Sequence, residues 1–358
     1  MATESAERRG RVPVIYGAAL AHRGGTGVYL RRLLRGLVEL EAPVRVVCPG
    51  GALTARRALS ASDWPQGVSK VLFEHFRAPR TARVAEASVV HLPAFGGAPP
   101  RGCPYVVTVH DMAYLARPSW FPAVRSLYYR MSFSRTARGA DLVMVDSRFS
   151  GAEAVRLAGV AEDAVRTVYL SADNSPEDSR PLLERLGLSS GYLLFVGTVE
   201  PRKNLTALLD AMRIIRRSRP NLKLLVAGRW GWGPAELRRR LTSQPGVLWP
   251  GPLGARDLRR AYCGAGLLVY PSLYEGFGLP PLEAARVGVP SVVGPAKALA
   301  EVYRNAAFHS GADARSIALT VEEALDSPAP GGMEALARRL TNARMAEEVL
   351  EVYEEVAS

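Results

Sequence analysis

Two glutamates, Glu275 and Glu283, lie eight residues apart in the stretch YPSLYEGFGLPPLEAA. An apolar run precedes this stretch and a helical pattern follows it, with two adjacent prolines where the first turn of a helix tolerates them. The expected order is therefore strand, loop and helix N-terminus. The first amides of a helix attract anions because they lack internal partners and carry the positive end of the macrodipole. Gly276 and Gly278 have no Cβ, so a phosphate can approach their backbone closely.

The two carboxylates add a second chemistry to this predicted anion site. A carboxylate beside a phosphate repels it unless the carboxylate has another task, and the usual task is to accept hydrogen bonds from sugar hydroxyls. We therefore predict that Glu283 binds a ribose and that Glu275 lies near a transferred sugar. The alternative is that Glu283 only complements the helix dipole and that Glu275 is an ordinary loop residue.

A second strand–glycine–helix junction carries two adjacent cations, Arg202 and Lys203, within FVGTVEPRKNL (195–205). An arginine and a lysine at the start of a helix form a clamp for phosphate. A solvated pair of basic residues is the alternative. The clamp is favoured because the chain has only four lysines and one of them falls at this junction.

His110 and Asp111 directly follow a strand pattern at 105–109. Ligands of parallel sheets lie beyond the carboxyl ends of the strands, so this position predicts a histidine that lines a cleft. The alternative is a structural histidine, with Asp111 capping the next helix. Gly24 and Gly25 precede a helical pattern that starts near Val28. A ligand-binding loop and a turn that only starts the helix are equally consistent with the sequence here.

The glutamate stretch, extended to YPSLYEGFGLPPLEAARVGVP, closely resembles the signature of the large retaining glycosyltransferase family 4, whose members have the GT-B fold. The resemblance continues in FVGTVEPRKNL and in VVTVHDMAYL (106–115), and a looser likeness covers nearly the whole chain. In one place the chain departs from the family: some members carry an arginine directly after the glycine, where this chain has Thr198. Part of the phosphate clamp is therefore missing or supplied elsewhere.

The resemblance implies a site for a nucleotide-sugar donor. It implies that His110 hydrogen-bonds the donor sugar, that Asp111 either orients His110 or contacts the acceptor, and that Gly228 lies near the base or the ribose. The loop of Gly24 and Gly25 is implied to close over the donor diphosphate and the acceptor. The predicted catalytic residues are His110, Lys203 and Glu275. The predicted donor-binding residues are Gly24, Gly25, Arg202, Lys203, Gly228, Glu275, Gly276, Phe277, Gly278, Leu279 and Glu283.

Strand and helix patterns alternate along the chain, which predicts parallel sheets covered by helices. The predicted fold class is α/β of the GT-B type, with two facing Rossmann-like domains and a cleft between them. We place an acceptor-binding domain at 1–172 and a donor-binding domain at 173–342, and we expect the terminal helix, 343–358, to pack back on the first domain. The strand patterns lie at 11–17, 44–48, 68–73, 87–92, 105–109, 142–146, 166–170, 192–197, 222–227, 247–249, 267–271 and 290–293.

The net charge of +12 fits an anionic partner such as a nucleoside diphosphate, a nucleic acid or an anionic membrane surface. Nearly all basic residues are arginines, which indicates a coding preference, so we discount the charge as evidence for nucleic acid. Three separated cysteines indicate a reducing compartment, and neither a transmembrane run nor a signal-peptide pattern is present. We expect a cytoplasmic protein. The aromatic and basic stretch 120–138 leaves peripheral membrane contact open, although a core-facing helix is favoured.

No Asp-x-Asp pair occurs in the sequence, so we expect metal-independent transfer, with a nucleotide sugar as co-substrate and no other cofactor. The predicted reaction moves a mannose-like or glucose-like sugar, with retention, to a hydroxyl of a glycan, glycolipid or natural product. GDP-mannose is slightly favoured over UDP-sugars as the donor because of the EPRKN form. The alternatives are a non-catalytic nucleotide-sugar-binding subunit, or an epimerase or phosphorylase on the same fold.

Overall fold

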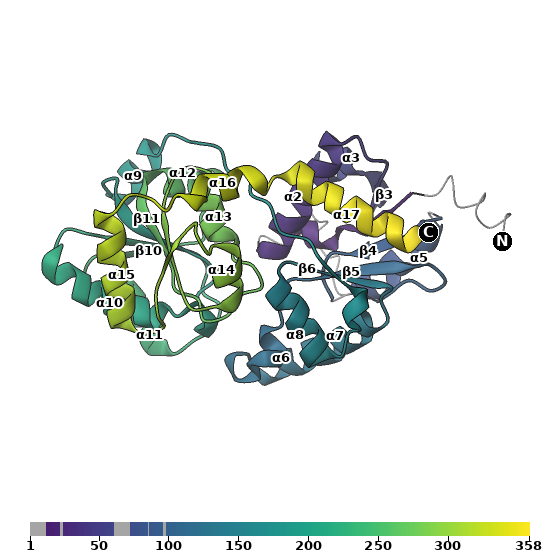
Figure 1. Cartoon of the computed structure of the whole chain (residues 1–358), viewed down its shortest axis with the longest axis horizontal. Helices are drawn as coiled ribbons and strands as arrows, with labels where there is room; N and C mark the ends of the chain where they lie inside the picture. The colour runs from purple at the N-terminus through teal and green to yellow at the C-terminus, as the bar shows by residue number, and fades with distance from the viewer. Residues whose placement is uncertain (1–11, 22–23, 61–71, 85, 96–97) are drawn as a thin grey trace. The chain divides into compact units, whose positions relative to one another are not determined.

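The computed structural model describes residues 12–21, 24–60, 72–84, 86–95 and 98–358 (Figure 1). The chain divides into two compact units. The first comprises residues 1–171 together with 340–358, and the second comprises residues 172–339. Each unit is built around its own sheet.

The sheet of the first unit has seven strands in the order β3-β2-β1-β4-β5-β6-β7. All neighbouring strands are parallel except β2 and β3, which form an antiparallel pair. The central strands are buried along their whole length because helices cover the sheet. The strands are β1 (Val14–Tyr16), β2 (Arg45–Cys48), β3 (Gly51–Thr54), β4 (Val90–Leu92), β5 (Tyr105–Val109), β6 (Leu142–Val145) and β7 (Val165–Thr167).

The terminal helix of the chain packs against the first long helix, α2, within this unit (Figure 1). The two helices approach so closely that a Cβ added at Gly36 would lie 2.1 Å from the carbonyl oxygen of Asn342. The helical segments of the unit are η1 (Gly17–Ala21), α2 (Gly25–Glu39), α3 (Ala55–Ser60), the π-helical η2 (Phe73–Arg77), α5 (Ala78–Val84), α6 (Ala113–Ala116), η3 (Pro118–Trp120), α7 (Ala123–Arg138), α8 (Arg148–Ala158), η4 (Glu162–Ala164) and α17 (Asn342–Ala357).

The second unit has a six-stranded sheet in the order β10-β9-β8-β11-β12-β13, and all of its neighbouring strands are parallel. Its strands are β8 (Tyr192–Val196), β9 (Leu224–Ala227), β10 (Val247–Gly251), β11 (Ala265–Tyr270), β12 (Ser291–Val293) and β13 (Phe308–His309). Its helices are α9 (Arg180–Leu186), η5 (Pro201–Lys203), α10 (Leu205–Ser218), α11 (Ala235–Ser243), α12 (Ala255–Gly264), α13 (Leu279–Ala285), α14 (Lys297–Val302), α15 (Ala314–Asp326) and α16 (Gly332–Arg339). Helices α10 and α15 pack together over a core of buried leucine, isoleucine and valine side chains.

Both sheets reverse their strand order at one place, between β1 and β4 in the first unit and between β8 and β11 in the second. This is the order of a Rossmann-like fold, and ligands bind such sheets beyond the carboxyl ends of the strands at the reversal point. The predicted class of two parallel α/β domains is therefore confirmed. The structure also shows which loops meet at each reversal point.

The structure corrects the sequence analysis in two places in the first unit. The predicted strand at 68–73 is wrong for its last two residues, because Leu72 and Phe73 are helical, while residues 68–71 lie outside the described residues. The antiparallel strand β3 was not predicted, because its glycine-initiated pattern resembles a loop.

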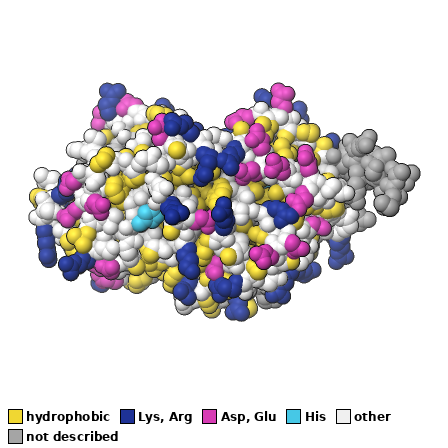
Figure 2. Space-filling model, viewed as in Figure 1, with side chains coloured by type: hydrophobic (Ala, Val, Ile, Leu, Met, Phe, Trp, Pro, Cys, Tyr) yellow, Lys and Arg dark blue, Asp and Glu magenta, His cyan; other side chains and the backbone are white. Residues whose placement is uncertain are grey.

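Charged side chains of both signs are interspersed over the face shown in Figure 2. The side of α7 that carries Phe133 is buried in an aromatic cluster with Phe95, Tyr114 and Tyr129, whereas Leu127 is exposed. Among the described helices, none is long and apolar enough to cross a bilayer.

Candidate active site

The two cations of the predicted phosphate clamp lie in η5, directly beyond the carboxyl end of β8. Asn204 adopts a left-handed conformation (φ 56°) that ends η5 and starts α10, and its side-chain amide donates to the carbonyl of Ala312. The backbone amide of Leu273, in the loop after β11, donates to the carbonyl of Arg202 over 2.8 Å. The two loops at the reversal point of the second sheet are thus tied together.

The loop after β11 ends at Gly278, which is the N-cap of α13 and has a φ of 90°. A Cβ at this position would lie 2.4 Å from a methyl group of Leu299, and the hydroxyl of Tyr303 donates to the Gly278 carbonyl. Both the backbone conformation and the lack of space therefore require glycine. This turn sets the direction in which the chain enters α13.

Glu275 bridges both cations of the clamp. Its Oε1 accepts from Lys203 Nζ over 2.5 Å, and its Oε2 accepts from Arg202 Nη1 over 2.7 Å. Arg202 also donates from Nε to Glu200 Oε1 over 2.5 Å. The side chains of Glu200, Lys203 and Glu275 are all less than a tenth exposed. The four groups, two cations and two carboxylates, balance one another in charge.

Tyr270 completes this cluster from the end of β11. Its hydroxyl accepts from Lys203 Nζ and donates to Glu275 Oε1 over 2.9 Å, and the ammonium also lies 4.6 Å from the centre of its ring. Desolvation by burial raises the pKa of this phenol well above its usual value, so the phenol stays protonated and able to donate.

The electrostatics of the cluster keep Glu275 ionised. Burial by itself would raise the pKa of this carboxyl, but Arg202 and Lys203 outweigh burial and lower it to about 2. Burial and the adjacent Arg202 lower the pKa of Lys203, against the opposing attraction of Glu275. Glu275 is therefore a carboxylate at neutral pH that holds both cations in place, and it has no proton to donate.

Glu283 lies in α13, which follows β11, and is 8% exposed. Its Oε2 accepts from the hydroxyl of Tyr262 over 2.6 Å, and its backbone carbonyl accepts from the side chain of Asn174. Lys203 and Glu283 follow adjacent strands of one sheet, beyond the same edge. The structure thus brings the predicted phosphate-binding and ribose-binding elements to one edge of the second unit.

Other predicted donor-binding residues surround this edge. Gly276 is buried, and Leu279 begins α13. The side chain of Phe277 is only 2% exposed and packs edge-on against the ring of Tyr303. The ring of Phe277 is therefore part of the core, and what remains for a ligand at this position is the backbone.

Gly228 follows β9 and touches the loop that follows β8. A Cβ at this position would lie 1.8 Å from the carbonyl oxygen of Gly197, while the indole of Trp249 donates to the Gly228 carbonyl over 2.7 Å. Gly228 is needed for this backbone contact whether or not it borders a base.

We expect Gly228→Ala to lower the melting temperature by several degrees, since the new methyl group must displace backbone and overpacking costs ~1–3 kcal/mol. The matched control is Gly50→Ala, because nothing lies within 4 Å of the added Cβ there and its φ is not in the left-handed region. Thermal unfolding followed by circular dichroism measures both. Equal melting temperatures for the two variants would contradict the tight contact at Gly228.

His110 lies at the carboxyl end of β5 in the first unit and has acceptors on both ring nitrogens. Its Nδ1 lies 2.9 Å from Asp146 Oδ2, and its Nε2 lies 3.1 Å from the carbonyl oxygen of Pro93. Neither a carboxylate nor a carbonyl can donate, so both ring nitrogens donate and the ring is an imidazolium. Burial opposes this charge, but Asp146 outweighs burial and raises the pKa of His110.

The sequence analysis missed Asp146. It left Asp111 as a group that either orients His110 or contacts the acceptor, but the Asp111 carboxylate accepts from the backbone amide of Ala113 at the start of α6. Asp146 directly follows β6, which pairs with β5. An aspartate that ends the neighbouring strand was the signal in the sequence that could have identified it.

Beneath His110 lies a buried chain of hydrogen bonds that reaches the terminal helix. The ring of Tyr29 contacts that of His110 edge-on, and its hydroxyl pairs with Thr108 over 3.1 Å. His91 continues the chain from Thr108 to Tyr353. Its Nε2 lies 2.8 Å from Thr108 Oγ1, and its Nδ1 lies 2.7 Å from the hydroxyl of Tyr353. Burial, followed by the repulsion of His110, lowers the pKa of His91 to about 3, so His91 is neutral.

His91 should make the stability of the protein depend on pH. In the unfolded chain it titrates near 6.5, and in the folded chain near 3, so only the unfolded state gains its proton between these values. Its contribution to stability is complete above pH 6.5, and below that it falls by about 1.4 kcal/mol per pH unit.

Urea unfolding of wild type at pH 6.0 and 5.0 should show this loss, and His91→Asn should largely abolish it. His309→Asn, at an exposed position, is the control, and a pH slope unchanged by His91→Asn would refute the assignment.

Gly24 and Gly25 lie at the start of α2, with Gly24 as the N-cap. Both are exposed, and nothing lies within 4 Å of a Cβ added at either, so their backbone is accessible to a ligand. Residues 22 and 23 of the same loop lie outside the described residues. In the part of the chain that is described, no group of three or more His, Cys, Asp or Glu residues is placed to hold a metal ion.

The two halves of the chain match known families. Residues 23–175 match Glycosyltransferase Family 4, and residues 190–327 match Glycosyl transferases group 1. This chain belongs to the group 1, family 4 glycosyltransferases. The resemblance found in the sequence is therefore confirmed.

The curated relatives include several mannosyltransferases. The chain is 35% identical, over 211 residues, to the O-antigen chain mannosyltransferase B of Escherichia coli, a match that covers 56% of this chain and 55% of that protein. It is 33% identical over 208 residues to a D-inositol 3-phosphate glycosyltransferase of Catenulispora acidiphila, covering 53% of this chain and 49% of that protein. The chain thus spans about half the length of these relatives.

Solved structures of glycosyltransferases share the fold over nearly the whole chain. HepE of Anabaena, in complex with UDP and glucose, superposes with a TM-score of 0.72 at 17% identity and covers 96% of this chain and all of its own. AviGT4, a glycosyltransferase involved in avilamycin A biosynthesis, superposes with a TM-score of 0.65 at 19% identity and covers 97% of this chain and 98% of its own. These similarities show that the fold is GT-B.

Proposed function

We propose that this protein is a retaining, metal-independent glycosyltransferase that moves a hexosyl group from a nucleoside diphosphate sugar to the hydroxyl of a glycan. The observation that carries the proposal is the cluster of Arg202, Lys203 and Glu275 at the reversal point of the second sheet. A cation pair beside the N-terminus of α13 is suited to a diphosphate, and Glu283 in that helix is suited to a ribose. The names of the mannosyltransferase relatives favour mannose as the sugar.

The cluster supports a leaving-group mechanism. As the bond between the anomeric carbon and the phosphate oxygen breaks, the electron pair and negative charge pass to the diphosphate. The preorganised cations Arg202 and Lys203 stabilise that charge, and a group of this kind typically contributes ~3–4 kcal/mol in the transition state. The acceptor hydroxyl attacks from the face of the leaving group, and its proton goes to the departing phosphate oxygen, which preserves the anomeric configuration.

Glu275 takes part in this proposal as a carboxylate. With a pKa of about 2 it has no proton for the leaving group, and the two cations that it holds reduce its strength as a nucleophile. A bound diphosphate competes for the same two cations, and this competition frees Glu275 to accept hydrogen bonds from the transferred sugar. His110, as an imidazolium, contributes a donor for a sugar hydroxyl in exchange for its bond to Pro93.

Incubation with GDP-mannose and UDP-glucose, with a panel of acceptor sugars, tests the proposed function. We expect release of the nucleoside diphosphate to depend on an acceptor, and proton NMR of the product to show the anomeric configuration of the donor. Product formation without an acceptor would favour an epimerase or phosphorylase. Binding without turnover of any donor would favour a nucleotide-sugar-binding subunit.

Metal removal tests the metal-independence of the proposal. Dialysis against EDTA should leave the transfer rate within about twofold of its starting value, because cationic side chains take the place that a metal ion holds in other transferases. Loss of activity on chelation, with recovery on adding Mg²⁺ or Mn²⁺, would overturn this part of the proposal.

A further inference from the structure

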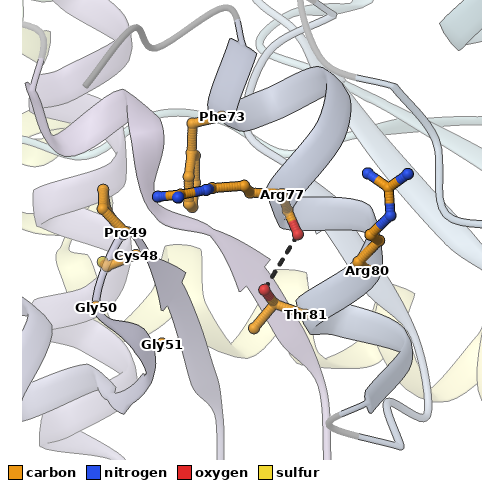
Figure 3. Close-up of a pocket in the computed structure, with 8 residues that line it drawn as sticks. All are labelled: Cys48, Pro49, Gly50, Gly51, Phe73, Arg77, Arg80 and Thr81. Atoms are coloured by element: carbon orange, nitrogen blue, oxygen red, sulfur yellow. Dashed lines mark hydrogen bonds between the residues drawn. The ribbon is translucent and has the colours of Figure 1, made fainter. Parts of the chain in front are cut away.

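A pocket in the first unit takes no part in the proposed mechanism. It has a volume of about 430 Å³ and lies beyond the carboxyl end of β2, between the connection to β3 and the π-helical η2 (Figure 3). Its two arginines diverge, because Arg77 extends across the pocket whereas Arg80 points away and donates to the backbone carbonyl of Phe76. The lining therefore does not converge on one ligand.

A buried hydroxyl of the second unit has no hydrogen-bond partner. Ser272 is completely buried, and its Oγ forms no hydrogen bond of normal geometry. Among the described residues, the other two buried side-chain atoms without a partner are the Nε atoms of Arg259 and Arg260, and both of these guanidinium groups bond a carboxylate through a terminal nitrogen. A buried polar group that is left unpaired costs free energy, so the Ser272 hydroxyl calls for an explanation.

The backbone at Ser272 is held from two sides. Ser272 follows β11 after Pro271, and its carbonyl accepts from the backbone amide of Ala296, in the loop after β12, over 3.3 Å. The next amide, that of Leu273, donates to the carbonyl of Arg202 in η5. The neighbouring loops therefore set the position of the Ser272 side chain, while the proton of its hydroxyl is free to turn towards an acceptor.

The carboxylate of Glu275 lies close to this hydroxyl. Burial and the two cations of the cluster have the largest effects on the pKa of Glu275, and the Ser272 hydroxyl lowers that pKa further. The two carboxylate oxygens already accept from Lys203, Arg202 and Tyr270. Without a ligand, Ser272 is thus beside an acceptor that three other donors hold.

We propose that Ser272 is a positioning residue, whose hydroxyl donates to Glu275 once a diphosphate has drawn the cations away from that carboxylate. The inference rests on the proposed donor site. Glu275 is only 5% exposed, so water cannot replace the two cations, and a buried carboxylate needs hydrogen-bond donors to stay ionised. Tyr270 already donates to Glu275 without a ligand, whereas Ser272 is a donor that is still to be engaged.

The missing partner gives the proposed hydrogen bond its effect. A hydrogen bond usually replaces another one, and its net contribution is then small. The Ser272 hydroxyl gives up no partner when it turns to Glu275, so the new bond stabilises only the state in which the diphosphate is bound. It also keeps the carboxylate in place for the transferred sugar after the cations have left it.

A double-mutant cycle on nucleoside diphosphate binding tests the proposal. Calorimetry with GDP and UDP compares wild type, Ser272→Ala, Glu275→Gln and the double variant. The control is Ser310→Ala, because Ser310 is a buried serine of the same unit whose hydroxyl donates to the carbonyl of Val293. The melting temperature of every protein in the set is measured without ligand.

We expect Ser272→Ala to bind nucleoside diphosphate about tenfold more weakly than wild type, as for the loss of a hydrogen bond to a charged group, while Ser310→Ala binds normally. In the Glu275→Gln background the same substitution should weaken binding by about threefold or less, because a neutral amide gains less from a donor than a buried carboxylate does. Equal losses in the two backgrounds, or no loss in either, would overturn the proposal.

The stability without ligand separates a positioning role from a structural one. Removing a buried hydroxyl that has no partner removes a desolvation cost, so Ser272→Ala should melt no lower than wild type. A drop of several degrees would show that the fold itself needs the hydroxyl, and it would refute the proposal even if Glu275→Gln did not fold. If wild type binds no nucleoside diphosphate, the proposed donor site itself fails, whereas equal binding by wild type and Ser272→Ala removes only this inference.

Discussion

Lys203→Ala should lower the rate of sugar transfer by about 10²–10³. Lys203 is buried in the cluster, and its ammonium is directed at Glu275 and Tyr270, so it is preorganised to meet the charge that develops on the leaving diphosphate. Steady-state kinetics with saturating donor measure this loss in kcat. Lys223→Ala is the matched control, because Lys223 is exposed and donates only to the carbonyl of Gly187 among the described residues.

The fold should survive the loss of Lys203. In Lys203→Ala, the Glu275 carboxylate still accepts hydrogen bonds from Arg202 Nη1 and from the hydroxyl of Tyr270, so it is not left without a partner. The melting temperature of Lys203→Ala therefore distinguishes a chemical effect from unfolding. A folded variant that transfers at a near-normal rate would remove the basis of the proposed mechanism.

Glu275→Gln should have a different signature, with losses in both stability and transfer. The amide cannot neutralise Lys203, and leaving a buried charge without its partner costs ~3–5 kcal/mol, whereas Arg202 keeps its bond to Glu200. We expect a melting temperature lower by several degrees and a transfer rate reduced by at least tenfold, because the ligand for the sugar is altered. Glu323→Gln, at an exposed position in α15, is the control.

Nucleoside diphosphate should rescue the stability of Glu275→Gln. The diphosphate supplies the negative charge that the variant lacks, and it no longer competes with Glu275 for the two cations. We therefore expect GDP or UDP to raise the melting temperature of this variant more than that of wild type. An equal or smaller shift would show that the diphosphate does not contact these cations.

Glu275→Gln should also remove the part of the pH dependence of stability that arises from the Glu275 carboxyl. The pKa of Glu275 is near 4.5 when unfolded and about 2 when folded, so its contribution to stability is complete above pH 4.5 and is lost as the pH falls towards 2. Urea unfolding between pH 5 and 3 should therefore be less steeply pH-dependent for Glu275→Gln than for wild type.

The elements of the second unit were largely predictable because most have a local signal, although the two-residue strand β13 was missed. Buried apolar runs identify the strands, and the glycines and prolines identify the turns at Gly197 and Gly278. The bridge from Glu275 to Lys203 was not predictable, because the two residues are 72 positions apart and meet only when β8 and β11 pair. The sequence analysis placed both residues near the substrate and did not show that they hold each other.

In the first unit, prediction was limited where tertiary contacts decide the structure. The apolar pattern that ends at Phe73 suits a strand, yet Phe73 begins a π-helical turn, Phe73–Arg77, in which its ring is buried. Asp146 was missed because it is 36 residues from His110, although it ends the neighbouring strand. Sequence reasoning identifies the ends of strands well, but it does not determine which two side chains pair across them.

Calorimetric titration of GDP and UDP into wild type, Arg202→Ala/Lys203→Ala and Arg217→Ala tests most directly whether the cluster is a diphosphate site. We expect one nucleoside diphosphate per chain in wild type and in Arg217→Ala, and binding at least tenfold weaker in the double variant. Equal affinity in all three proteins would contradict the account, because the diphosphate would then be held elsewhere.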